Sequence, residues 1–381
     1  MRASTVRKSD KPPSGKSPSN PDLFFEKELA GENPLTKATG RRLYDLGAEF
    51  YELHPWDLLA DQDLVMVKEP DSGEMCYCSV MGALGQVYSL QVYIGREGYQ
   101  LFKRIALGQP ITAGEFLASQ RGVSVEFVPS GELTTPDRRL LRAFSHPFRK
   151  DVICPMFRAG RPGYHPWYIT EEEGRQLALC LATVLEFCDH MLTHPPIEYW
   201  GKEDTYPLVS LVSGKRPDQM CEISLAAAQW SPLATLAPAN YDKDRVARIL
   251  SKSHRIVGIM EVDHFYGGAM FGGKSERKTC VRAAIATDAR SGFAFPPVLG
   301  EPSDVKGDLL VRVVLGAIES ANFLPQEIRV TGADSAMALS TLTNALDISV
   351  QVVESLPSLE EFKRQMLRMM GDSGLSLDRD P

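Results

Sequence analysis

The stretch GIMEVDHFY, residues 258–266, decides how the C-terminal half of the chain is interpreted. Its apolar, β-branched and aromatic residues predict a strand. Glu261 and Asp263 lie two positions apart, and because side chains alternate along a strand, both carboxylates face the same side. An ionised carboxylate inside a domain is strongly destabilising unless it is paired or bound to a metal. The stretch therefore predicts either a metal site or a buried polar contact.

The segments that follow this strand form an alternating pattern. Two further strands are predicted at 279–288 and 292–300, followed by a helix at 304–323 with one apolar face. The rest of the chain predicts a strand at 326–331, a helix at 334–346, a strand at 348–354 and a helix at 358–370. With 255–266 as the first strand, the order is βββαβαβα. This order predicts a mixed five-stranded sheet with helices on its faces.

The N-terminal half also predicts an α+β arrangement. Strands are expected at 63–70 and twice within 74–95, where Gly82 and Gly85 favour a hairpin turn over a phosphate-binding loop. Two pairs, Thr112 with Glu115 and Thr170 with Glu173, match the capping box of a helix N-terminus. The other expected elements are helices at 41–53, 96–108 and 170–192, a strand at 123–128, and a hairpin of strands at 207–213 and 220–230.

The length of 381 residues predicts two domains. We expect a disordered tail at 1–35, rich in Ser, Pro and Lys, and an N-terminal domain at 36–240. The C-terminal domain is expected at 241–371, followed by a second disordered tail at 372–381. The sequence does not specify how the two domains are oriented.

Composition narrows the class of protein. The chain is 43% hydrophobic and 24% charged, which is typical of a soluble globular protein. Its longest apolar stretch, 177–187, is too short to cross a bilayer, so no membrane association is expected. The net charge of −7 argues against non-specific binding to a polyanion. The N-terminus has no apolar segment of the kind found in a secretory signal, so a cytoplasmic location is expected by default. Seven scattered cysteines, without a CxxC pair, predict reduced thiols.

The order of elements over roughly 255–370 resembles the ribonuclease H-like fold shared by integrases and DDE transposases. In that superfamily, acids on the first strand, near the end of the fourth strand and on a later helix hold two divalent metals for phosphodiester hydrolysis. The resemblance implies Asp263, Asp334 and Glu360 as catalytic residues, with Glu361 as another choice for the third. Asp263 and Glu261 are the candidate metal ligands. Mg or Mn and a nucleic-acid partner follow only under this hypothesis.

Each candidate also has a structural interpretation. Residues 330–332 read Val-Thr-Gly where the second aspartate usually falls, and Asp334 stands where a helix N-cap is expected. Ser358 and Glu361 match a capping box. Asp263 needs only a hydrogen-bonded partner such as Arg282 on the neighbouring strand. These roles would satisfy the acids without any catalysis.

Two further groups of residues are candidate sites. His190 and His194 have the i, i+4 spacing of zinc ligands, but a third ligand is not evident, and an exposed helix terminus is the alternative. The glycine-rich segment 267–278 carries Lys274, Arg277 and Lys278, which either contact phosphate or keep a sheet edge soluble.

Segment 54–99 combined with the C-terminal RIVGIMEVDHFY, LPQEIRV and LPSLEEF motifs resembles a family of uncharacterised bacterial two-domain proteins. Its two parts are 7309-like and 6930-like domains of unknown function. This resemblance implies an architecture and a location but no activity. The leading hypothesis is a non-catalytic binding or regulatory module built on a degenerate ribonuclease H-like domain. The alternatives are a divalent-metal nuclease or strand-transfer enzyme, and a small-molecule or peptide site on the N-terminal sheet.

Overall fold

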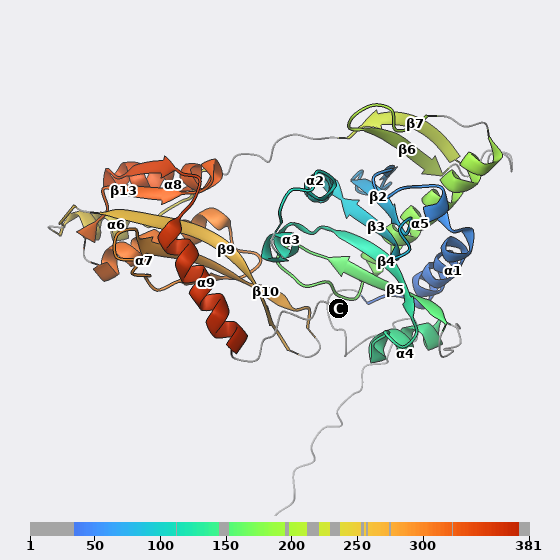
Figure 1. Cartoon of the computed structure of the whole chain (residues 1–381), viewed down its shortest axis with the longest axis horizontal. Helices are drawn as coiled ribbons and strands as arrows, with labels where there is room; N and C mark the ends of the chain where they lie inside the picture. Colours follow the sequence, from blue (N-terminus) through green and yellow to red (C-terminus); the bar gives the residue numbers. More distant parts are fainter. Residues whose placement is uncertain are drawn as a thin grey trace, which may run out of the picture.

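The computed structural model divides the chain into two α+β units, each with its own mixed sheet (Figure 1). It describes residues 34–111, 113–144, 152–194, 198–211, 221–228, 237–252, 255–256, 258–273, 276–321 and 323–372. The expected mixed α+β class with two domains is confirmed. Within the described residues, no helix is long and apolar enough to span a membrane.

The N-terminal sheet has seven strands in the order β5-β4-β3-β2-β1-β6-β7. Neighbours from β5 to β1 pair antiparallel, β6 runs parallel to β1, and β7 pairs antiparallel with β6. The turn between β2 and β3 holds Gly82 and Gly85 at positive φ, so the expected hairpin is confirmed. The strands are β1 (Val65–Lys68), β2 (Met75–Met81), β3 (Tyr88–Ile94), β4 (Gly122–Pro129), β5 (Ile153–Gly160), β6 (Thr205–Leu211) and β7 (Cys221–Ala227).

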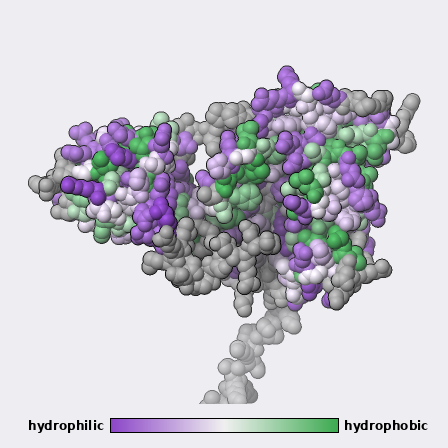
Figure 2. Space-filling view, viewed as in Figure 1, coloured by the Kyte–Doolittle hydropathy of each residue, from purple (hydrophilic) through white to green (hydrophobic). Residues whose placement is uncertain are grey.

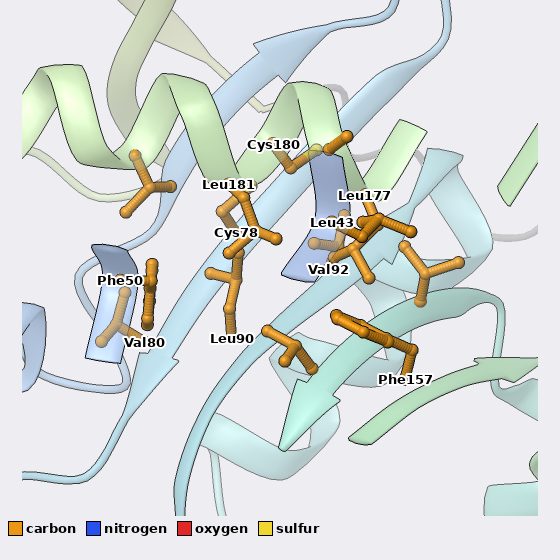
Figure 3. Packing of buried hydrophobic residues seen from close by; sticks show 14 of the residues in the cluster. Leu43, Phe50, Cys78, Val80, Leu90, Val92, Phe157, Leu177, Cys180 and Leu181 are labelled. Atoms are coloured by element: carbon orange, nitrogen blue, oxygen red, sulfur yellow. The ribbon is translucent and has the colours of Figure 1, made fainter. Parts of the chain in front are cut away.

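Helices cover both faces of this sheet. On one face, α1 (Lys37–Leu53) and α5 (Glu171–Thr193) pack together with the strands into the main core. Figure 3 shows Leu43 and Phe50 of α1 and Leu181 of α5 pointing toward strand residues such as Val80 and Leu90. Burying each such side chain contributes about 1.5–3 kcal/mol. On the other face, α2 (Gly95–Ala106) packs through Tyr99 and Phe102.

Short elements complete the N-terminal unit. They are the 3-10 helix η1 (Pro55–Asp57), α3 (Ala113–Ser119) and α4 (Thr135–Ala143). The Thr170–Glu173 capping box at the start of α5 is confirmed, because each side chain bonds the backbone of the other residue. Thr112, the other expected cap, lies outside the described residues. The sequence interpretation missed α4 and β5.

The C-terminal sheet has five strands in the order β11-β10-β9-β13-β14. Strands β9, β10 and β11 are antiparallel, whereas β13 runs parallel to both β9 and β14. The acid-bearing strand β9 is therefore central, as expected. The strands are β9 (Ile259–Phe271), β10 (Thr279–Asp288), β11 (Val298–Gly300), β13 (Glu327–Val330) and β14 (Ser349–Val352), with a separate pair β8 (Arg255–Ile256) and β12 (Phe323–Leu324).

The two faces of this sheet carry different helices. Met260 and Val262 of β9 share a core with α6 (Lys243–Leu250), α7 (Lys306–Ala321) and α8 (Ala333–Leu346). The opposite face packs against α9 (Pro357–Asp372) through a smaller cluster that includes Ile285 and Leu359. Because Glu261 and Asp263 alternate with Met260 and Val262, they face α9.

Some expected boundaries differ from the observed ones. Leu35, assigned to the N-terminal tail, is 5% exposed and lies against Gly174 of α5. Helix α6, which begins at Lys243, is not among the elements that the sequence predicts. Residues 1–33 of the first tail, the second tail beyond 372 and the segment 212–220 lie outside the described residues.

Candidate functional site

Glu261 holds the start of α9. Its side chain is 2% exposed, and Oε2 accepts a hydrogen bond of 3.0 Å from the backbone N–H of Leu359. Leu359 lies in the first turn of α9, where backbone N–H groups have no partner within the helix. A carboxylate there also interacts favourably with the helix dipole. The buried acid is thus satisfied by a helix N-terminus that is distant in the sequence.

Asp263 is paired with a lysine from the same helix. Its Oδ2 lies 2.5 Å from Nζ of Lys363, and the two side chains are 18% and 24% exposed. The Lys363 ammonium also lies 5.1 Å from the centre of the Phe265 ring. The sequence interpretation named Arg282 as the partner, and this was wrong. Arg282 pairs in register with Tyr266, so its side chain projects from the opposite face of the sheet.

Arg282 instead organises a second buried group. Its Nε donates to Nε2 of His264 at 2.8 Å, and its Nη1 donates to the backbone oxygen of Asp304, just before α7. Burial, together with the charges of Arg282, Lys306 and Lys363, lowers the pKa of His264 to about 3. His264 is therefore neutral near pH 7, with Nε2 as the acceptor.

The other proposed catalytic acids lie at helix starts. Asp334 is the second residue of α8, whose N-cap is Gly332, so its expected role as the N-cap was wrong. Oε1 of Glu360 accepts a hydrogen bond of 3.3 Å from the backbone N–H of Leu356.

The capping box expected at Ser358 and Glu361 is also absent from this helix start. Helix α9 begins at Pro357, so Ser358 lies inside it, and its hydroxyl donates to the carbonyl of Ala289 at 3.1 Å. Glu361 instead contacts Gln365 and Arg364 one turn later.

The structure does not gather these acids into a metal centre. Across the described segments, which include Asp263, Asp334 and Glu360, no three His, Cys, Asp or Glu side chains are placed to hold a metal ion. His190 and His194 stack with their ring centres 3.9 Å apart, and Nδ1 of His194 lies 3.1 Å from the His190 carbonyl oxygen. The catalytic assignment of Asp263, Asp334 and Glu360 stays a prediction.

A charged cleft of about 550 Å³ lies in the N-terminal domain. It is bounded by the turn between β1 and β2, the ends of β3 and β5, the start of β4 and the N-terminus of α5. Five carboxylates line it: Glu69, Asp71, Glu74, Glu172 and Glu173. Three guanidinium groups line it as well: Arg121, Arg161 and Arg175. The sequence interpretation missed this site.

Only part of this charge is neutralised within the cleft. Arg121 lies 2.7 Å from Glu74, and Arg161 lies 2.8 Å from Glu173. A hydrogen bond from Ser72 lowers the pKa of Glu69. Asp71 and Glu172 are exposed, and their carboxylates have no hydrogen-bond or ion-pair partner among the described residues. The cleft therefore presents an excess of negative charge.

Helices α2 and α3 present an exposed hydrophobic surface. Figure 2 shows hydrophobic residues gathered on this part of the molecule. Ile105, Leu107 and Phe116 are 44%, 64% and 40% exposed, and Ile105 and Phe116 line an apolar groove of about 700 Å³.

Comparison with known protein families finds two domain matches in this chain. Residues 41–208 match a domain of unknown function, DUF7309. Residues 245–367 match a second domain of unknown function, DUF6930. No curated protein and no solved structure matches the chain. The two matches fall on the two α+β units, so the chain combines two domains of unknown function.

We expect Glu261→Ala to lower the free energy of unfolding by about 2–3 kcal/mol, because the Leu359 N–H loses a charged acceptor in a buried site. Glu261→Gln keeps an acceptor oxygen and should lose less. Urea unfolding gives the stability, and hydrogen exchange at the Leu359 amide locates the effect. Glu354→Gln, at an exposed position, is the control. Unchanged protection of Leu359 in Glu261→Ala would contradict this role.

We expect acid to destabilise the protein through His264. The unfolded chain has the ordinary pKa of 6.5 and binds more protons than the folded chain from pH 6.5 down to about 3. The contribution of neutral His264 to the free energy of unfolding is complete above pH 6.5. It decreases as the pH falls and is about 2 kcal/mol smaller at pH 5. His264→Gln keeps an acceptor for Arg282 but does not titrate. Urea unfolding at pH 7 and pH 5 should show a smaller loss in this variant, and equal losses would argue against the assignment.

Proposed function

We propose that the C-terminal domain has a ribonuclease H-like fold. Support comes from the strand order β11-β10-β9-β13-β14, with β9 to β11 antiparallel and β13 and β14 parallel to β9. Further support comes from the helices, since α7 and α8 share one face while α9 lies on the other. Asp263 on the central first strand then occupies the place of the first catalytic acid. A fold of this kind supports no activity by itself.

We propose that this domain is non-catalytic and serves in binding or regulation. The observation that carries the proposal is the ion pair between Asp263 and Lys363. A unit positive charge about 4 Å from a divalent cation repels it by roughly 8 kcal/mol at an effective dielectric constant of about 20. The lysine thus supplies the positive charge that metals supply in a two-metal site. Glu261 is engaged by α9, and Val330 ends β13 without an acid.

We expect no metal-dependent cleavage of labelled single- or double-stranded DNA or RNA with Mg²⁺ or Mn²⁺. Asp263→Asn should behave as the wild type does, and a nuclease of known activity in the same buffer verifies the assay. Asp308→Asn, which changes an exposed acid on α7, is the matched control. Cleavage that is lost in Asp263→Asn and kept in Asp308→Asn would favour the alternative enzyme that uses Asp263, Asp334 and Glu360.

We further propose that the charged cleft of the N-terminal domain is a ligand-binding site of the protein. Its volume of about 550 Å³ is suitable for a small molecule. The excess of carboxylates favours an organic cation with ammonium or guanidinium groups, which Asp71 and Glu172 are placed to receive. The location that fits this function is the cytoplasm, supported by seven cysteines that are all free thiols.

Spermidine is a suitable probe of this cleft in titration calorimetry. We expect binding that weakens with added salt, because the cleft is open to solvent. Asp71→Asn and Glu172→Gln should each weaken it about two- to fivefold, the range for partly exposed ion pairs. Glu132→Gln removes an exposed charge outside the cleft and should leave affinity unchanged. Equal affinity in all four proteins would place spermidine elsewhere.

A further inference from the structure

The hairpin formed by β9 and β10 reaches from the C-terminal domain to the N-terminal one. The backbone N–H of Cys280 donates to the Gly163 carbonyl at 3.0 Å, and that of His165 donates to the Lys278 carbonyl at 2.8 Å. Tyr164 and Thr279 form an antiparallel bridge between these bonds. The segment after β5 therefore pairs with the start of β10 as a short strand.

Arg277 anchors this contact with its side chain. It is 12% exposed and donates to the backbone oxygens of Ala159, at 3.1 Å, and Tyr168, at 3.4 Å. Its guanidinium also lies 3.7 Å from Oε2 of Glu173. The sequence analysis predicted that Arg277 either contacts phosphate or keeps a sheet edge soluble. In the structure, Arg277 instead forms a contact between the two domains that is largely buried.

Glu173 connects this contact to the cleft. One carboxylate oxygen, Oε1, accepts from Nε of Arg161 at 2.8 Å, and Oε2 caps the backbone N–H of Thr170 at 2.8 Å. Arg161, Thr170 and Glu173 all line the cleft, as does Tyr164 of the interdomain bridge. Of these lining residues, the C-terminal hairpin contacts Tyr164 and Glu173 directly, and Glu173 in turn binds Arg161 and Thr170.

Close backbone packing extends the interface away from the hairpin. Gly114 of α3 lies so near Tyr266 of β9 that an added Cβ would be 2.1 Å from the Tyr266 carbonyl oxygen. A Cβ on Gly163 would lie 3.1 Å from Pro302. Within the N-terminal domain, Gln120, just after α3, donates to the carbonyl of Tyr164 at 2.6 Å and so connects α3 to the segment that the hairpin contacts. The two domains therefore meet along both α3 and the segment 160–168.

We propose that the β9–β10 hairpin is a latch that fixes the cleft wall, so that filling of the cleft and docking of the two domains are thermodynamically linked. This inference rests on the proposed ligand role of the cleft. A ligand that contacts Glu173 or Arg161 alters the same ion-pair network that holds Arg277. By linkage, any effect of docking on ligand affinity equals the effect of the ligand on docking.

Hydrogen exchange on the full chain without ligand measures the latch directly. The amides of Cys280 and His165 donate across the interface, so their exchange reports undocking. Arg277→Ala should speed exchange at both amides about tenfold or more, because it leaves the largely buried carboxylate of Glu173 without one of its partners. Amides of β4 should stay as slow as in the wild type, which separates undocking from unfolding. Arg312→Ala, at an exposed position on α7, should change nothing.

A second variant tests the link to the cleft. Glu173→Gln keeps an acceptor for the α5 cap but removes the charge that Arg161 and Arg277 share. We expect faster exchange at Cys280 and His165, and a double variant with Arg277→Ala that is little faster than either single one. Unchanged exchange in Arg277→Ala would overturn the latch. Fully additive effects would overturn its link to the cleft wall.

Spermidine then tests linkage in the wild type. We expect it to change exchange at Cys280 and His165 in wild-type protein, and to have a smaller effect in Glu173→Gln. Spermidine that binds in the cleft without altering either amide would overturn the linkage. A failure of spermidine to bind would reject the ligand class proposed for the cleft, while the ligand-free exchange of the Arg277 and Glu173 variants would still decide the latch.

Discussion

The attachment of α9 to the central strand of the C-terminal domain depends on two acids that are out of bulk water. Placing a carboxylate in that position is unfavourable unless its lost hydration is replaced. For Glu261, a hydrogen bond from the N-terminal backbone of α9 replaces that hydration. For Asp263, the ammonium of Lys363 replaces it. Both partners come from the same helix. The helix therefore does not simply cover an apolar face, since it also compensates the charges that the strand buries.

Much of the fold was predictable because it rests on local periodicity. Alternation along β9 and the apolar faces of α7 and α8 are properties of short segments. Helices α7 and α8 appear where expected, whereas β9 continues to Phe271, five residues past its expected end. The missed helices are short, although α4 begins with a capping box of Thr134 and Asp137 and α6 with the N-cap Asp242. Helix α4 has nine residues and α6 has eight, and both have few buried positions. The tertiary contact that stabilises such a short helix is not visible in its own sequence.

The candidate site was predictable only in part, for a related reason. Strand geometry predicts that Glu261 and Asp263 face the same side of the sheet, and this is confirmed because both contact α9. The partner of Asp263 depends on which helix crosses that face, so an adjacent-strand residue, Arg282, was chosen wrongly. Lys363 did carry a signal, since it falls one turn after Leu359 on the buried side of α9. The charged cleft is lined by segments about a hundred residues apart in the sequence, and no local pattern in the sequence indicates it.

Strand β9 has the acids that hold α9 in its first half and leads at its far end into the hairpin that touches the N-terminal domain. From Met260 to Tyr266 its side chains alternate between a core-facing and a helix-facing side, before the register shift opposite Cys280 and Val281. An insertion or deletion of one residue between these points would reverse that alternation and shift the hairpin by one position. Variation among related chains should therefore exchange side chains in β9 far more readily than it changes the number of residues in the strand.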